Sequence, residues 1–298
     1  MSAWSEKVVQ LLRRMNSFCS AGSSRDRCFR FEVGGAQVGW VPPHVAPVLA
    51  RYPDVFLPPQ GAVVSLCPRL DTPKTRSEAV DGVLQDLRQQ DGFTCLRGWR
   101  DERYSVMPQF SDVPLMWMER AATSLFGVKR YGVHVNGYTL GDGGVVNMWL
   151  ARRAVTKQTY PGLLDNVAAG GLAAEVGIRH TLVKECLEEA CIPAAIAARA
   201  RAVSTVSYTY DDEEGVFPES QFVFDLELPG DFRPTVGDGE VQEFYLLPID
   251  QVKELLATDD FKPNSAMVVL DFLIRHSFID PDTEPCYQQF VAGLHQTL

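Results

Sequence analysis

The chain has 298 residues, 46% hydrophobic and 22% charged, and its 28 basic against 38 acidic side chains give a net charge of −10. This is the composition of a folded globular protein, and it excludes disordered, collagen-like and low-complexity chains. A general nucleic-acid or membrane-surface binder needs a basic footprint, so we expect neither partner. A few local Lys and Arg side chains still suffice to bind a phosphorylated small molecule.

The first 120 residues predict a smaller unit of mixed helices and strands. Apolar side chains recur at helical spacing from Trp4 to Met15, which predicts an amphipathic helix docked on the protein, with an organellar targeting segment as the alternative. Residues 29–41 alternate around two glycines and predict a hairpin. Three further elements follow: a short helix at 45–52, a strand at 61–66, and a helix capped by Ser77 and ended by Gly92.

The second half is richer in strands. The elements expected are strands at 131–140 and 145–153 around a GDGG turn, a glycine-rich loop at 161–171, a helix to Ala190, strands at 220–228 and 240–248, and helices at 251–256 and 266–276. A helix framed by strands on both sides implies a layered α/β domain. We place the domain boundary near 118–126, which gives one domain over 1–120 and a second over 121–298.

Cysteine usage and hydropathy bear on the compartment. The seven cysteines are odd in number, scattered, and form no C-x-x-C pair, so a disulfide framework and a zinc ribbon are not expected. No run approaches the ~18 apolar residues of a membrane span. We therefore expect a cytoplasmic protein.

The most informative segment is GGLAAEVGIRHTLVKECLEEACI, residues 170–192. On a helix, Glu185, Glu188 and Glu189 fall within roughly 100° of one another and border the apolar face. A solvated charged face is the ordinary interpretation of such a run. However, carboxylates at these spacings repel one another, and a divalent cation removes that cost. Ligands that are all oxygen favour Mg²⁺ or Mn²⁺ over zinc.

This segment resembles the Nudix box, G-x5-E-x7-R-E-U-x-E-E-x-G-U, where U is aliphatic. The positions that match are Gly170, Glu185, Glu188, Glu189 and Ile192. The positions that depart are Val176 in the first glutamate slot, Lys184 in the arginine slot and Cys191 in the last glycine slot. Lys184 keeps the positive charge of arginine but not its planar fork.

The resemblance extends over nearly the whole chain. The segments that carry it are FEVGGAQVGWVPPHVAPVLARYPDVF, LRGWRDERYSV, ERAATSLFGVKRYGVHVNGY, WLARRAVTKQTYPGLLDNVAAGGL, SYTYDDEEGVFPESQFVFDLELP and DGEVQEFYLLPIDQV. They are similar to the Nudix branch related to thiamine pyrophosphokinases, which has an extra N-terminal domain. The resemblance implies an α/β/α sandwich with a mixed sheet, preceded by a smaller α+β domain. It also implies a Mg²⁺-dependent hydrolase that converts thiamine diphosphate or its oxidised, damaged analogues to the monophosphate and phosphate.

From these patterns we expect three groups of site residues. The metal-binding and catalytic group is Glu185, Glu188 and Glu189 with Lys184, joined by Glu243 as a further metal ligand or by Glu240 in its place. The substrate-binding group is Arg152, Arg153, Lys157, Gly170 and Gly171, near a strand end and at the glycine lead-in. Aromatic candidates to stack on a heterocycle are Trp149, Tyr160, Tyr208, Tyr210 and Phe217, while His134 is expected to be a core histidine.

Three other interpretations stay open. The first is a hydrolase of ADP-ribose or another nucleoside diphosphate conjugate. The second is an isopentenyl diphosphate isomerase, which shares the Nudix fold but needs a catalytic cysteine just before the box, whereas Cys67 and Cys95 lie far upstream. The third is a ligand-binding module with weak catalysis, suggested by Val176 and Cys191.

Overall fold

A mixed seven-stranded sheet forms the centre of the larger half of the computed structural model, which describes residues 2–298. Its strands are β6 (Arg130–Leu140), β7 (Val146–Arg153), β8 (Leu164–Asn166), β9 (Ala168–Gly171), β10 (Arg201–Asp212), β11 (Gly215–Glu227) and β12 (Val241–Pro248). The order is β10-β11-β6-β7-β12, with β8 paired to β7 and β9 to β6. Strands β6 and β11 run parallel and the other pairs antiparallel, as expected for a mixed sheet.

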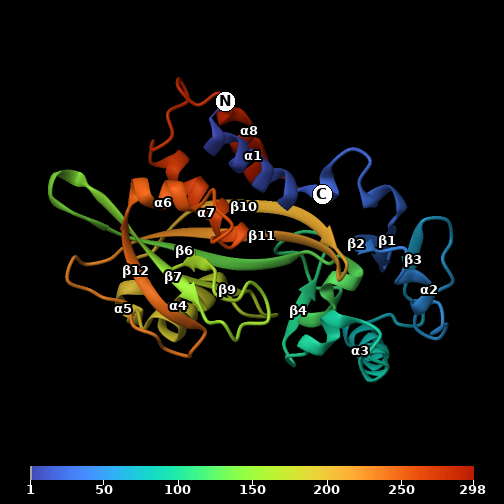
Figure 1. Cartoon of the computed structure of the whole chain (residues 1–298). Helices are drawn as coiled ribbons and strands as arrows, with labels where there is room; N and C mark the ends of the chain where they lie inside the picture. Colours follow the sequence, from blue (N-terminus) through green and yellow to red (C-terminus); the bar gives the residue numbers. More distant parts are fainter. Residues whose placement is uncertain (1) are drawn as a thin grey trace.

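Helices cover both faces of this sheet (Figure 1). On one face lie α4 (Ile178–Ala190) and α5 (Ala194–Ala197), and on the other α6 (Ile249–Leu255), α7 (Pro263–Arg275) and α8 (Tyr287–Leu294). Side chains alternate along a strand, so Val133 and Val135 of β6 pack toward α4, whereas Met148 and Leu150 of β7 pack toward α7. This is the α/β/α sandwich expected from the sequence.

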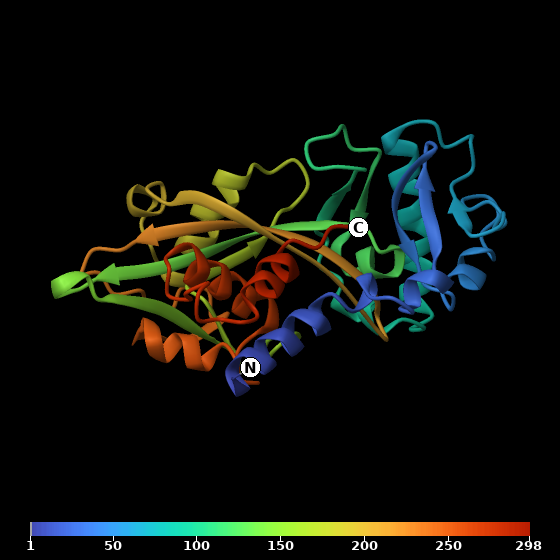
Figure 2. The same ribbon diagram turned by 90° about the horizontal axis from the view of Figure 1, so that it is seen from above.

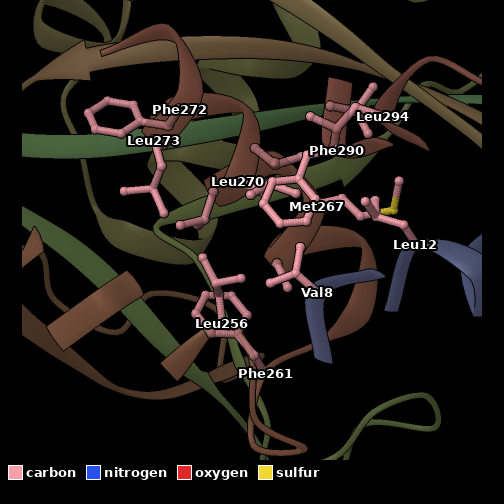
Figure 3. Close-up of a cluster of buried hydrophobic side chains, with 14 of the residues drawn as sticks. Val8, Leu12, Leu256, Phe261, Met267, Leu270, Phe272, Leu273, Phe290 and Leu294 are labelled. Atoms are coloured by element: carbon pink, nitrogen blue, oxygen red, sulfur yellow. The ribbon is translucent and has the colours of Figure 1, made fainter. Parts of the chain in front are cut away.

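The N-terminal helix α1 (Ala3–Met15) is part of this larger core. Val8 and Leu12 are buried against Phe290 and Leu294 of α8 (Figure 3). Burying an aliphatic side chain of this size contributes about 1.5–3 kcal/mol. The predicted docked helix is therefore confirmed, and Figure 2 shows how the chain then crosses from α1 to the smaller half.

The smaller half holds a three-stranded sheet, a hairpin and a long helix. Its helices and strands are β1 (Phe29–Val33), β2 (Ala36–Val41), α2 (Ala46–Leu49), β3 (Val63–Ser65), α3 (Pro73–Gln89), β4 (Arg103–Val106) and β5 (Met116–Glu119). Short 3₁₀ helices connect them, namely η1 (Ser17–Cys19), η2 (Ser24–Arg27), η3 (Thr94–Gly98) and η4 (Arg120–Phe126). A further one, η5 (Asp142–Gly144), lies in the larger half. The predicted hairpin is confirmed, since Gly34 and Gly35 both hold positive φ between β1 and β2. The division of the chain after residue 120 stays a prediction.

Some local predictions were wrong. Helix α3 begins earlier than expected, because Thr72 rather than Ser77 caps it and forms a reciprocal capping box with Thr75. Ser77 lies inside the helix, where its hydroxyl donates to the carbonyl of Pro73. The loop expected at 161–171 contains β8 and β9, and β10 and α8 were not foreseen. No helix within residues 2–298 is long and apolar enough to cross a bilayer.

Candidate active site

Helix α4 is fixed on the sheet by one apolar side. Leu182, Cys186 and Ala190 are fully buried and belong to one cluster with Val133 and Val135 of β6. The helical period therefore determines which side chains border that contact and which face solvent. The three glutamates occupy this border, as the sequence predicted.

The end of α4 explains one departure from the Nudix box. Cys191 holds a left-handed backbone with φ of 51°. The N–H of Ile192 donates to the carbonyl of Cys186 at 2.9 Å, which closes the helix end. Glycine adopts this conformation without penalty, whereas a residue with a Cβ is strained. Cys191 thus keeps the geometry that the motif's glycine provides, at some cost in stability.

The three glutamates differ in exposure. Glu189 is only 8% exposed and accepts a hydrogen bond from the backbone N–H of Ala169 at 2.9 Å. Burial, together with the charges of Asp165 and Glu185, raises the pKa of Glu189 to about 8. Burial also raises the pKa of Glu185, whereas Glu188 is exposed. Two carboxyl groups are therefore held where a nearby cation would favour their ionised forms.

The two glycines of β9 provide space for larger side chains. A Cβ on Gly170 would lie 2.2 Å from the carboxyl carbon of Glu185. A Cβ on Gly171 would lie 2.0 Å from the hydroxyl oxygen of Tyr104, which comes from β4. Any side chain at either position would push these groups away. Both glycines therefore let strand β9 approach its neighbours closely.

A cavity of about 950 Å³ opens beside α4 and gathers most of the predicted residues. The predicted residues that line it are Glu185, Glu188, Glu189, Lys184, Gly170, Gly171, Arg153, Lys157 and Glu240. Lys157 forms an ion pair with Glu240 in its wall. One cavity thus combines carboxylates that suit a metal ion with cations that suit a phosphate.

Two of the predicted charged residues lie outside this cavity. Arg152 donates to both carboxylate oxygens of Asp260, and Glu243 accepts from the hydroxyl of Tyr245. The two residues are partners in the β7–β12 pairing, where Arg152 points away from the side that its neighbour Arg153 lines. The structure therefore gives Glu243 no place beside the glutamates of α4, and Glu240 lies there instead.

A buried ion-pair network lies in the wall of the cavity. Arg153 donates to Asp165 at 2.9 Å and to the carbonyls of Thr159 and Tyr160. Lys262 donates to the same carboxylate at 2.9 Å. Burial alone raises the pKa of Asp165, but the charges of Lys262 and Arg153 outweigh it and hold this pKa well below its usual range. Arg153 therefore fixes the loop that follows β7.

One end of the cavity is aromatic. The side chains there are Tyr160, Tyr208, Tyr210 and Phe217. The rings of Tyr210 and Phe217 stack with centroids 4.7 Å apart. Trp149, also predicted to stack on a ligand, is instead buried in the core beneath α4. His134 is a buried histidine bonded to Asn166 at 2.8 Å, as predicted, and burial lowers its pKa to about 4.

An ion pair lies next to the aromatic rings. Glu219 accepts from Arg130, from the hydroxyl of Tyr208 at 2.6 Å and from the amide of Gln221 at 2.8 Å. Burial raises the pKa of Glu219, but the charge of Arg130 outweighs it and leaves the pKa lowered. This end of the cavity is therefore polar but carries no net charge from the pair.

The sequence did not single out several residues that line the cavity. They are Arg100, Tyr104 and Arg120 from the smaller half, Arg130, Glu219 and Gln221 from the sheet, and Lys262 before α7. The only signal in the sequence for Arg100 and Tyr104 is the density of charge in LRGWRDERYSV. Cys95 also lines the cavity, but burial raises its pKa to about 11, so it is not an activated nucleophile.

The donor chemistry of the α4 glutamates fits a hard divalent cation. All three offer carboxylate oxygens to one cavity, and the raised pKa values of Glu185 and Glu189 follow from burial and from their closeness to other carboxyls. Within residues 2–298, no three His, Cys, Asp or Glu side chains already surround one point. Lys184 instead contacts Glu185 at 3.2 Å and Glu188 at 2.7 Å.

Comparison with known proteins assigns the two halves to separate families. Residues 7–130 match a domain of unknown function (DUF4743), and residues 130–268 match the NUDIX domain. Nudix hydrolase 20, chloroplastic, from Arabidopsis thaliana is 38% identical over 275 residues, which cover 89% of this chain and 72% of that protein. The chain belongs to the Nudix hydrolase family. It is therefore a hydrolase that acts on diphosphate bonds, and the predicted fold and reaction class are confirmed.

A second plant relative and a solved structure are also similar to this chain. Nudix hydrolase 24, chloroplastic, also from Arabidopsis thaliana, is 40% identical over 248 residues, which cover 83% of this chain and 67% of that protein. The solved NUDIX domain of Shewanella oneidensis NrtR, in complex with ADP ribose, is 13% identical with a TM-score of 0.39 and covers 52% of this chain and 91% of its own. Nudix enzymes generally use divalent metals such as Mg²⁺. The cytoplasmic location stays a prediction, since both plant relatives are named as chloroplastic.

Proposed function

We propose that this Nudix hydrolase cleaves thiamine diphosphate and its oxidised, damaged analogues to the monophosphate and phosphate. The observation that carries the proposal is a single cavity whose wall is chemically different at its two ends, one beside β9 and α4 and the other on β10 and β11, across β6 from β9. Glutamates and cations line one end, which suits a diphosphate and its metal. Aromatic rings line the other, which suits a planar heterocycle. The resemblance of nearly the whole chain to the thiamine pyrophosphokinase-related branch supports the choice of ring.

Residues of α4 and its neighbours would have separate roles at the diphosphate. Glu185, Glu188 and Glu189 would hold Mg²⁺, or Mn²⁺ in its place. The bound ion supplies Lewis-acid activation of the phosphate and of the attacking water. Lys157 lines the same region and offers a cation to the phosphate oxygens. Gly170 keeps Glu185 in reach, because any side chain there would displace its carboxylate.

The ring end favours a heterocycle without a formal positive charge. The Arg130–Glu219 pair is already neutral, and Glu219 is engaged by Tyr208 and Gln221. Within residues 2–298, the buried Nε–H of Arg130 has no hydrogen-bond partner. We therefore expect the oxidised analogues to be better substrates than thiamine diphosphate itself.

The size of this preference is limited by the energy of one interaction. One hydrogen bond to a charged donor, or one desolvated charge, changes binding by about 1–3 kcal/mol, or roughly tenfold to a hundredfold in kcat/KM. The test compares kcat/KM for thiamine diphosphate, its oxo and oxy forms, and ADP-ribose in one Mg²⁺ buffer. The oxidised forms should lead. A tenfold or greater advantage for ADP-ribose would show that the substrate assignment is wrong, while the reaction class would stand.

A further inference from the structure

One wall of the cavity comes from the smaller half of the molecule. Residues of η3, β4 and η4 line it together with the carboxylates of α4. The N–H of Ala174, which follows β9, donates to the carbonyl of Arg103 at 2.8 Å. The hydroxyl of Tyr104 fills the space that Gly171 leaves open. This N-terminal wall, defined as the lining residues between Thr94 and Ser124, is therefore attached directly to the glycine strand of the active site.

The N-terminal wall is rich in arginine, and one of its arginines is not neutralised by a carboxylate. Arg97 is paired with Asp91 at 2.7 Å, and Arg120 with Glu102 at 2.8 Å. Within residues 2–298, the Arg100 guanidinium forms no ion pair, and its side chain donates only a long hydrogen bond to Gln158 at 3.5 Å. Within the described residues, Arg100 is thus the arginine lining this wall whose charge no carboxylate neutralises.

The position of Arg100 places it near the predicted diphosphate. Its partner Gln158 follows Lys157, which pairs with Glu240 in the same cavity. Arg100, Glu240 and Glu185 all line this cavity. Two cations, one from each half of the chain, therefore surround a corner of the cavity beside the α4 glutamates.

We propose that Arg100 binds a phosphate group of the substrate, so that the domain of unknown function completes the active site of the Nudix domain. The proposal rests on the proposed function only in that a diphosphate occupies the cavity. A diphosphate brings several negative charges next to three glutamates, and it needs cations on its other side. The planar fork of arginine matches phosphate oxygens with two parallel hydrogen bonds. Lys157, which is paired with Glu240, lies in the same cavity.

Binding of methylenediphosphonate, which hydrolysis cannot consume, tests this role. The full chain in Mg²⁺ is titrated calorimetrically as wild type, Arg100→Gln, Arg100→Lys and Arg69→Gln. Arg69 is an exposed arginine of the same half that pairs with Asp54 outside the cavity. Losing a charge-assisted contact should raise the Kd of Arg100→Gln about tenfold. Arg100→Lys should lose less, and Arg69→Gln should match the wild type.

The outcomes separate this proposal from the substrate assignment. Equal Kd values for Arg100→Gln and the wild type, or an equal loss in Arg69→Gln, would overturn the role of Arg100, and so would the absence of any binding by the wild type. Failure to hydrolyse thiamine diphosphate would refute the substrate assignment, but the titration would still test whether Arg100 binds a diphosphate. In turnover of any accepted diphosphate, Arg100→Gln should raise KM more than it lowers kcat. Gln158→Ala, which removes only the positioning contact, should have a smaller effect.

Discussion

The two walls of the cavity are encoded in different ways. On the α4 side, the carboxylates, their lysine and the glycines opposite them all fall within residues 170–192. The residues of the N-terminal wall are spread over Thr94 to Ser124, in the half of the chain that has its own hydrophobic core. A helix carries its own spacing, so local sequence suffices to bring catalytic acids together. The residues that meet the rest of the substrate come together only through the packing of two halves.

The largest effect is expected on the α4 side. Replacing Glu188 or Glu189 with Gln keeps size and helix propensity but removes a charge, and kcat should fall on the order of 10²–10⁴-fold. In Glu189→Gln the amide oxygen still accepts from Ala169, so the fold should persist, with an unchanged or higher Tm. Steady-state kinetics and thermal unfolding measure both.

The matched control is Glu254→Gln, an exposed helical glutamate of α6 outside the cavity. It should leave kcat unchanged. If both α4 variants also keep wild-type kcat, their carboxylates form a solvated face, and the two walls do not differ in the way described.

A smaller effect should follow from filling the space beside Glu185. In Gly170→Ala the new Cβ would lie 2.2 Å from the Glu185 carboxyl carbon, so the carboxylate must move. A displacement of about 1 Å at a catalytic group costs up to about a hundredfold in rate. The control is Gly82→Ala, where the Cβ meets nothing within 4 Å inside α3. That variant should keep its activity and gain roughly 0.5–1 kcal/mol in stability. Equal kcat in both variants would show that Gly170 is not needed for space.

The smallest effect concerns the end of α4. Cys191→Gly relieves a left-handed backbone at a residue with a Cβ and should stabilise the protein by about 0.5–1 kcal/mol. Cys191→Ala keeps the Cβ and should show no such gain. Urea unfolding of the three proteins measures the difference. A loss of stability in Cys191→Gly would mean that the cysteine side chain contributes more than its backbone conformation costs.

The contrast between the walls also explains what the sequence was able to predict. The carboxylates of α4 were found because a helical period is local. Arg152 and Arg153 were both predicted to bind substrate, yet neighbours on a strand point to opposite faces, and only Arg153 lines the cavity. Sequence alone does not say which face that is. Glu243 lies opposite Arg152 in the β7–β12 pairing and is excluded with it.

The predictions that were wrong or missed have physical reasons. Strand β10 carries several polar residues and ends in Asp211 and Asp212, a residue type that is uncommon in strands, but it pairs with β11 along its length. A serine hydroxyl often caps a helix, which is why the sequence predicts Ser77 as the cap, but its hydroxyl donates to a carbonyl one turn earlier within α3. The contacts of Arg100 and Tyr104 join residues far apart in the chain, which no spacing rule detects.

Metal dependence tests most directly whether α4 forms the catalytic wall. The full chain is stripped with EDTA, and release of phosphate from the best diphosphate of the panel is followed as Mg²⁺ is added back. Turnover should be lost in metal-free buffer and return with Mg²⁺, because three glutamates without a cation would repel the substrate. In Glu189→Gln the Mg²⁺ concentration for half-maximal rate should rise, whereas Glu254→Gln should follow the wild type. Full activity in metal-free buffer would contradict a metal-binding role for the α4 glutamates.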